Sequence, residues 1–268
     1  MAITAMISAL GAPGVSTTVA ALATAWPGPV LAVDADPARG SLVPGWLSRW
    51  WVDGRLTTDG AVTFAASTRR MTSVPAEGLA GHAQEVPHAR HVRVLPGVLH
   101  REQATAIGSD GWSRLASALR DLTASGPDVL VDAGRWSPQT PWPLLGAADR
   151  VLLAVRPSLR SCSGSTDLAR HLADRYAAVE LAVLAADSHG AADTAAALGL
   201  PVGLTVPEDA MSAHVFSDGA RIPARLDRRP LWRATRRNAR AFHRQAHQPV
   251  RFDHDTDAGV DVVRAGIE

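Results

Sequence analysis

Lysine is absent from this sequence of 268 residues: all 27 of its basic residues are Arg, against 26 acidic residues. The absence excludes mechanisms that need a lysine amine, such as Schiff-base chemistry, a lysine general base or the lysine that usually contacts phosphates in a phosphate-binding loop. A genome biased towards GC-rich codons accounts for Arg in place of Lys. The preference for Arg therefore implies no function by itself.

Cysteine is nearly absent as well, since Cys162 is the single one. This excludes a disulfide framework and a zinc site built from several cysteines. No stretch reaches the roughly 18 apolar residues that a membrane-spanning helix needs. The apolar start lacks a basic region of the kind that opens a signal peptide, because the first basic residue is Arg39. We therefore expect a soluble, cytoplasmic protein, with peripheral association to a membrane or nucleoid left open.

Short apolar runs that do not alternate with polar residues are typical of parallel strands covered on both faces. Helical patterns lie between them, which predicts an α/β fold: a doubly wound, mostly parallel sheet with helices on both faces. We expect a single domain over residues 1–250 and an acidic tail, free to be disordered, over residues 251–268. The predicted strands are residues 3–10, 29–33, 91–95, 128–131, 150–155, 181–185 and 202–206, and the predicted helices are residues 16–25, 112–124, 165–178 and 191–198.

A Gly-rich turn joins the first predicted strand to the first predicted helix. The start of a helix offers free backbone N–H groups and a positive dipole end, and glycine allows close approach of the backbone, so this turn suits a phosphate. A threonine in the first helical turn can bind Mg²⁺. The predicted phosphate-binding loop consists of Gly11, Ala12, Pro13, Gly14, Val15, Ser16, Thr17 and Thr18.

This loop resembles that of the ParA/MinD family of P-loop ATPases, which reads Lys-Gly-Gly-Val-Gly-Lys-Thr-Thr. Gly11 stands at the first lysine of the family and Ser16 at the second. Val15 replaces the glycine before the second lysine, whereas Thr17 and Thr18 match. The loop thus resembles a degenerate one, similar to the TadZ or CpaE pilus-assembly branch or to MinD-like proteins of actinobacteria.

Other segments follow the order of the same family over about residues 1–210. The stretch up to Asp36 is similar to the family's second strand, whose second Asp helps to organise the attacking water and the metal shell. The stretch up to Asp132 is similar to the Walker B strand, whose last Asp holds a Mg²⁺-bound water. Pro207 and Glu208 lie in a segment similar to the loop that flanks the base. Asp187 lies near the position where the family often uses Asn to read the base.

The resemblance implies a nucleotide site that allows ATP and Mg²⁺ without requiring either. Thr17, Asp36 and Asp132 would hold Mg²⁺, Asp36 would be the catalytic residue of an active enzyme, and a homodimer would form across the nucleotide face. Charge stabilisation dominates phosphoryl transfer, and without lysine it must come from the backbone, the metal and an arginine. Three arginines just past strand ends are candidates: Arg39, Arg135 and Arg156.

We therefore expect a positioning or regulatory scaffold in partitioning, secretion or pilus assembly, that is, a pseudo-ATPase with an unknown protein partner. A slow but active ATPase that uses Arg for charge compensation is one alternative. A former nucleotide site that now only supports the fold is another.

A basic segment follows at residues 225–251, with nine Arg and one Asp and thus a net charge of +8. It predicts a basic C-terminal helix at about residues 228–247 that could bind DNA or an anionic membrane surface. The alternative is a final helix that packs on the sheet with solvated arginines. The basic surface of this helix would consist of Arg233, Arg236, Arg237, Arg240 and Arg244.

Three tryptophans, Trp46, Trp50 and Trp51, follow the segment that ends in Asp36. Trp46 and Trp50 are four residues apart, so a helix would place them on one face. They predict either a docking patch for a partner or a helix packed against the sheet.

Overall fold

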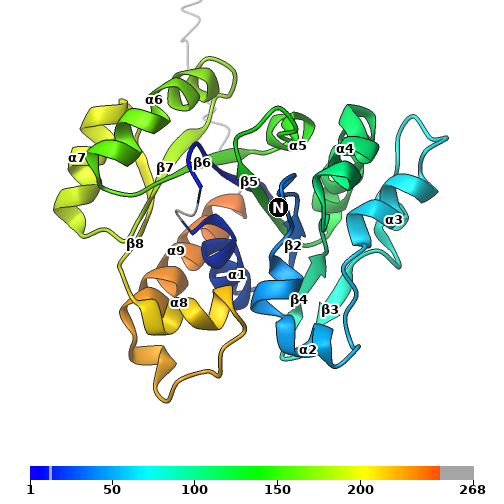
Figure 1. Cartoon of the computed structure of the whole chain (residues 1–268), viewed down its shortest axis with the longest axis horizontal. Coiled ribbons are helices and arrows are strands. Elements are labelled where there is room, and N and C mark those ends of the chain that lie inside the picture. The colour runs from blue at the N-terminus through cyan, green and yellow to red at the C-terminus, as the bar shows by residue number, and fades with distance from the viewer. Residues whose placement is uncertain (12–13, 248–268) are drawn as a thin grey trace, which may run out of the picture.

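The computed structural model describes residues 1–11 and 14–247 (Figure 1). Its strands are β1 (Ile3–Ser8), β2 (Val30–Asp34), β3 (Gln84–Val86), β4 (Ala89–Leu95), β5 (Asp128–Arg135), β6 (Arg150–Val155), β7 (Val179–Leu184) and β8 (Val202–Val206). They form one eight-stranded sheet in the order β3-β4-β2-β5-β1-β6-β7-β8. Only the edge pair β3–β4 is antiparallel within the described residues. The predicted fold class is confirmed.

Helices cover both faces of this sheet (Figure 1). Their bounds are α1 (Val15–Ala25), α2 (Ser48–Val52), α3 (Gly60–Ser67), α4 (Arg101–Ser125), α5 (Trp142–Gly146), α6 (Leu159–Ala173), α7 (Ser188–Leu198), α8 (Ala210–Ser217) and α9 (Pro230–Ala246), with short turns η1 (Leu42–Trp46), η2 (Ala76–Leu79) and η3 (Leu226–Arg228). One hydrophobic core lies beneath α3 to α7. The second core lies beneath α1, α8, α9 and η1.

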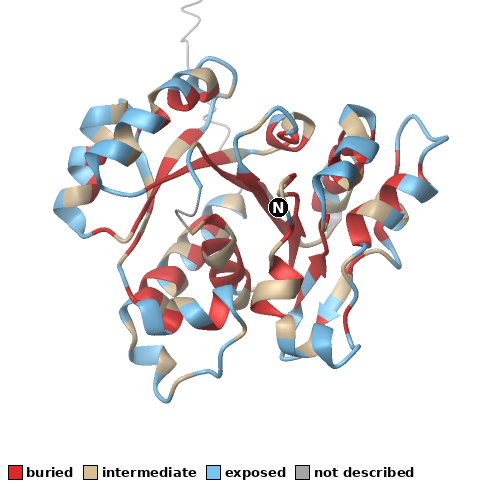
Figure 2. Ribbon diagram, viewed as in Figure 1, coloured by how far each residue is buried: buried red, intermediate tan, exposed pale blue. Residues whose placement is uncertain are grey.

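The central strand β1 shows why its sequence is apolar throughout. All of its residues are buried, which Figure 2 shows for the inner strands as a whole. Ile3 and Ile7 belong to the core beneath α3 to α7, whereas Met6 belongs to the core beneath α1. Because side chains of a strand point alternately to its two faces, both sets of positions must be apolar when both faces are covered.

The C-terminal helix α9 packs with its apolar face against α1 and β8. Its buried residues are Leu231, Ala234, Thr235, Ala239 and Phe242. The helix predicted at about residues 228–247 is therefore present, although it begins at Pro230 after η3. The apolar face packs, as the second interpretation of this helix expected, and four of its five predicted surface arginines are exposed, whereas binding to DNA or to an anionic membrane surface stays a prediction. The tail 251–268 and the domain boundary at residue 250 lie outside the described residues.

Helices α4 and α6 differ most from the sequence-based expectation, and α6 spans Leu159–Ala173 where residues 165–178 were expected. Helix α4 begins at Arg101, well before residue 112, because His100 and Gln103 form a capping box at its start. Within it, Gly108 has a φ of 61°, which interrupts regular helix geometry and hides the pattern in the sequence. No helix within residues 1–11 and 14–247 is long and apolar enough to cross a lipid bilayer.

The tryptophan segment lies in η1 and α2. Trp46 is buried, and Trp50 stacks on His88 with ring centroids 4.5 Å apart. Trp51 is 37% exposed. The packed interpretation therefore accounts for Trp46 and Trp50, and Trp51 is the one of the three tryptophans that is exposed.

Candidate functional site

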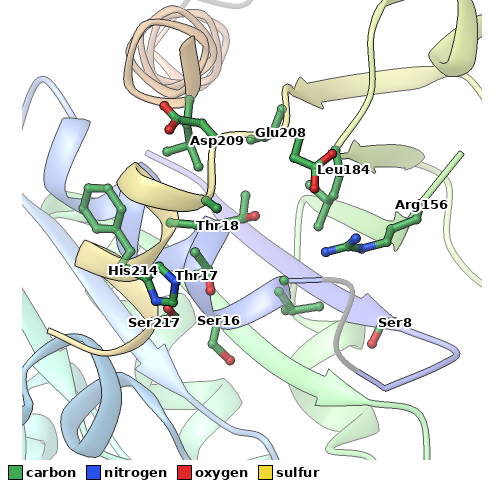
Figure 3. A pocket seen from close by; sticks show the side chains of 18 of the residues that line it. Ser8, Ser16, Thr17, Thr18, Arg156, Leu184, Glu208, Asp209, His214 and Ser217 are labelled. Carbon is green, nitrogen blue, oxygen red and sulfur yellow. The ribbon is translucent and has the colours of Figure 1, made fainter. Parts of the chain in front are cut away.

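A cavity of about 530 Å³ opens in front of the N-terminus of α1 (Figure 3). Its lining comes from the carboxyl ends of β1, β5, β6, β7 and β8 and from helices α1 and α8. Sheets of this kind bind ligands outside the carboxyl ends of their strands, where neighbouring connections run to opposite faces. The volume falls in the range of small-molecule and cofactor sites. The cavity is thus the main candidate site of the described residues.

The first turn of α1 faces this cavity without a side-chain cap. Gly14 precedes the helix with φ 110° and ψ 30°, a left-handed conformation that glycine adopts without strain. No acidic residue lies in the first turn, and no side chain hydrogen-bonds to its amides. The first N–H groups of a helix have no partner within the helix. They are available to an anion such as a phosphate.

The predicted phosphate-binding loop divides between core and cavity. Val15 is buried in the core beneath α1 and also contributes to the cavity lining. Ser16 and Thr17 are half-buried and line the cavity, and the amide of Thr18 donates to the carbonyl oxygen of Gly14 at 2.9 Å. Figure 3 shows the three hydroxyl side chains at the start of α1. Ala12 and Pro13 lie outside the described residues.

Three aspartates gather behind this turn, at the ends of β2 and β5. Asp34 and Asp132 are paired in register on these parallel strands, and both are fully buried. Oδ2 of Asp34 accepts the amide of Leu42 at 2.8 Å, and Oδ1 of Asp132 accepts the amide of Gly134 at 2.9 Å. Their other oxygens, Oδ1 of Asp34 and Oδ2 of Asp132, have no hydrogen-bond partner within the part of the chain that the structure describes.

Burial dominates the electrostatics of these aspartates. It raises the pKa of Asp132 to about 7, an increase that proximity to Asp36 reinforces. The Ser16 hydroxyl approaches Asp132 and partly lowers this pKa, yet no hydrogen bond of ordinary geometry from a described residue reaches Oδ2. Burial and then the charge of Asp132 raise the pKa of Asp34 well above its ordinary value. The site therefore has a deficit of positive charge close to Ser16, where the lysine would stand.

Asp36 lies nearer the cavity surface and lines it. Burial raises the pKa of Asp36, whereas the amides of Ala38 and Arg39 and the guanidinium groups of Arg135 and Arg101 oppose the increase. Gly134 has a φ of 65°, and a Cβ at this position would clash with the Asp36 carboxyl group. Glycine at this position therefore allows β5 to turn directly beside Asp36.

Arginine side chains supply the positive charge at the carboxyl ends of these strands. Arg135 and Arg156 line the cavity, and Figure 3 shows Arg156 extending into it. They also line an adjoining cavity of about 450 Å³ together with Gly11 and Arg160. A Cβ at Gly11, the place of the family's first lysine, would lie 3.4 Å from Nη1 of Arg135. Arg39 is exposed and outside the cavity lining, so two of the three expected arginines lie at the site.

Apolar side chains also line the cavity. Leu184, Val206 and Pro207 contribute to the lining, and Leu184 lies close to Gly14 at the start of α1. Pro207 and Glu208 therefore line the cavity. Asp187 does not: the structure places it outside the lining, where its exposed carboxylate caps α7 by accepting the amide of Gly190 at 2.8 Å. The capping role explains an Asp before a helix.

Several residues of the site do not follow from the sequence analysis. Asp34 is the first carboxylate of the same Asp-x-Asp segment as Asp36, so a local signal for it exists, although only the second residue was assigned to the site. Arg101 and His214 come from α4 and α8, and no local pattern links them to the loop. His214 lines the cavity and its Nδ1 lies 2.7 Å from Oδ2 of Asp218. Only the fold brings these segments together.

Solved structures with the same fold are numerous. MinD from Pyrococcus horikoshii OT3, complexed with Mg-ADP, is 17% identical, with a TM-score of 0.70 over 92% of this chain and 97% of that chain. A ParA family ATPase from Chlorobium tepidum TLS is 16% identical, with a TM-score of 0.69 over 89% of this chain and 98% of that one. A variant of Cyanothece McdA in complex with ATP is 14% identical, with a TM-score of 0.64 over 92% and 96%.

No protein-family model and no curated protein sequence matches this chain. The fold is nevertheless that of the MinD and ParA ATPases, with nearly the whole of each chain superimposed. The resemblance inferred from the loop and the two Asp-bearing strands is thereby confirmed at the level of the fold.

Proposed function

We propose that this chain is a ParA/MinD-like positioning or regulatory protein that binds a magnesium nucleotide and hydrolyses it slowly or not at all. The observation that carries the proposal is the cavity in front of α1, which combines the uncapped start of this helix with apolar lining residues such as Val206 and Pro207. Phosphates suit the helix start. A base suits the apolar part of the lining.

The oxygen atoms at the cavity and directly behind it are suited to bind Mg²⁺. Oδ2 of Asp132 is buried without a partner among the described residues, and near neutral pH its carboxyl group, with a pKa of about 7, is only partly ionised. A divalent cation at such a site would supply the missing positive charge. Thr17, Asp36 and Asp132 would hold it, directly or through water. Hard oxygen donors of this kind are those that Mg²⁺ prefers.

Slow hydrolysis follows from the chemistry of the residues at the loop. A P-loop lysine contacts the β and γ phosphates as a compact charge, and Ser16 supplies none at that position. Arg135 and Arg156 reach the cavity from strand ends on one side of the loop. They support binding of an anion, whereas the transition state also needs charge beside the transferred group.

Calorimetric titration of the full chain with ATP and Mg²⁺ tests the proposal, with turnover measured in the same samples. We expect saturable binding below millimolar ATP and turnover close to the background without protein. Ser16→Glu should abolish binding through repulsion from phosphate, while Ser16→Gln, of equal size and no charge, should retain it. Absence of binding to the wild type at millimolar ATP would leave only a scaffold that acts without nucleotide.

An active but slow ATPase is the first alternative, because Arg135 and Arg156 both line the cavity. In that case Asp36→Ala should abolish a measurable turnover without abolishing binding. Turnover of the wild type equal to background would exclude it.

A surface that binds nucleic acid or an anionic membrane is the second alternative. It rests on α9, where Arg233, Arg237, Arg240 and Arg244 are exposed and Arg236 is half-buried. None of them forms an ion pair within the described part of the chain. A homodimer across the nucleotide face also stays part of the proposal, and light scattering with and without ATP tests it.

A further inference from the structure

A second polar centre lies at the amino end of β5, away from the nucleotide cavity, where α9 ends. Asp128, the first residue of β5, has a side chain that is only 2% exposed. His243 and His247 approach it from the last turn of α9, with side chains 26% and 34% exposed. Because they are four residues apart on a helix, both imidazoles lie on one face.

The potential ligand atoms converge on one point. Nδ1 of His243 lies 2.8 Å and Nε2 of His247 lies 3.1 Å from the same oxygen, Oδ2 of Asp128. All three atoms lie within 4.8 Å of one another. In a tetrahedral site with bonds near 2.05 Å the ligand atoms are about 3.3 Å apart. The two distances to Oδ2 of Asp128 are within about 0.5 Å of this spacing.

Neighbouring groups hold the carboxylate of Asp128 in place. The indole Nε1 of Trp26 donates to Oδ2 at 2.9 Å, and the amide of Ala2 donates to Oδ1 at 2.9 Å. Such outer-shell donors orient ligands in metal sites.

The number of donors at Oδ2 favours a cation over hydrogen bonds alone. A carboxylate oxygen has two lone pairs. The indole of Trp26 can only donate, so it takes one of them, and the two imidazoles then compete for the other. A metal ion resolves this competition, because both histidines would offer their own lone pairs to it.

The site is also accessible. A cavity of about 370 Å³ lies over it and is lined by Met1, Pro29 and Pro127 together with the three ligands. A Cβ at Gly28 would lie 3.2 Å from Cε1 of His243, which shows how closely the backbone packs on this ring. The imidazole is thus held in place, and the cavity gives a path to the three ligands.

We propose that His243, His247 and Asp128 form a binding site for a divalent transition-metal ion of the zinc class, which fastens the end of α9 to the start of β5. Imidazole and carboxylate ligands suit Zn²⁺ and Co²⁺. Three protein ligands leave a fourth position for water. This site is separate from the nucleotide cavity and does not depend on the function proposed for it.

The test uses the full chain without a histidine tag, stripped with EDTA and then dialysed free of it. We expect one equivalent of Zn²⁺ to bind by calorimetry, and Co²⁺ to give visible absorption that Zn²⁺ abolishes. Zinc at about 100 times its dissociation constant should raise the melting temperature by about 5 °C.

The decisive variant is His243→Asn with His247→Gln. The Asn and Gln amide nitrogens can take the places of Nδ1 and Nε2, so hydrogen bonds to Asp128 persist while the metal ligands are lost. We expect zinc affinity to fall at least about 100-fold, since even second-shell changes cost 10- to 100-fold. The matched control, His189→Asn with His91→Gln, changes two exposed histidines outside both sites and should bind like the wild type.

Two results would overturn the proposal. One is the absence of zinc binding to the wild type at about 100 µM, which is far above the dissociation constants of protein zinc sites. The other is zinc affinity of the double variant within threefold of the wild type. If the double variant does not fold, His247→Gln alone replaces it, because this residue is the more exposed of the two.

Discussion

Asp34 and Asp132 are register partners on the parallel strands β2 and β5, and both are fully buried. Each keeps one carboxylate oxygen without a hydrogen-bond partner among residues 1–11 and 14–247. Two like charges in a buried setting oppose each other's ionisation, so this pair stays partly protonated when no cation is near. Because Ser16 lies close to Asp132, the absence of a lysine at position 16 should affect the ionisation of this pair, which can be measured.

The first prediction concerns the pH dependence of stability. In the unfolded chain Asp132 ionises near 3.8, whereas burial raises its folded pKa to about 7. The stability that this group contributes is therefore present below pH 3.8 and is lost as the pH rises through 7. Asp132→Asn has no titrating group at this position. As the pH rises from 3.8 to about 7, the free energy of unfolding of this variant should therefore increase by roughly 4 kcal/mol relative to that of the wild type.

Urea unfolding of both proteins at several pH values, without Mg²⁺, measures this difference. Thr24→Ala, a change at the distant end of α1, serves as the control and should follow the wild type. Parallel stability curves for Asp132→Asn and the wild type would contradict the assigned direction of the pKa shift.

The second prediction restores the missing charge. Ser16→Lys should strengthen ATP binding about tenfold, because a charge-assisted hydrogen bond contributes about 1.5–3 kcal/mol. The ammonium group would also approach Asp132 and favour its ionised form. Ser16→Met adds comparable length without charge and separates the two effects. Equal affinities of the Lys and Met variants for ATP would show that position 16 does not face the phosphates.

The third prediction assigns the anion-binding arginines. Arg135→Ala and Arg156→Ala should each weaken nucleotide binding about tenfold, since each removes a charged donor from the cavity. Arg170→Ala is the control, because Arg170 is exposed on α6 and pairs with Asp167 at 3.2 Å. Calorimetry with ATP and with inorganic pyrophosphate gives the readout. Unchanged affinity in both cavity variants would assign anion binding to the backbone alone.

The fourth prediction concerns the basic surface of α9. Replacing Arg233, Arg236, Arg237 and Arg240 by Ala should weaken binding to duplex DNA and reduce its salt dependence by about 0.9 in log–log slope for each phosphate that is no longer neutralised. The control replaces Arg55, Arg69, Arg70 and Arg175, which are exposed elsewhere. DNA binding that decreases equally in both variants would indicate a nonspecific charge effect. Binding of the same variants to vesicles with anionic lipid tests the alternative of a membrane surface.

Sequence patterns predicted the part of the fold that depends on local burial. Strands such as β1 and β6 are apolar on both faces, so their runs are visible without any knowledge of the partners. Edge strand β3 has three residues, of which only Val86 is buried, so no pattern marked it. Helix α3 is built largely of small residues and starts at Gly60, which weakens its helical signal.

The candidate site was predictable where its residues are close in sequence. The loop from Gly14 to Thr18 and the strand ends at Asp36 and Asp132 all lie at the cavity or directly behind it. Asp187 could not be placed in the same way, because its position depends on how β7 turns into α7. The cluster of Asp128 with two histidines could not be predicted for a similar reason, since Asp128 lies more than 100 residues before both histidines in the chain.

Strand β5 carries one carboxylate near each of its two ends. Asp128 and Asp132 are four residues apart and point to the same face, which places them about 13 Å apart along the strand. Both carboxylates are buried, so salt screens the interaction between charges at the two ends less than it would at the surface. An ion bound at one end should therefore change the affinity for an ion at the other, and strand β5 couples the two sites electrostatically. Titration of zinc with and without magnesium nucleotide measures this coupling.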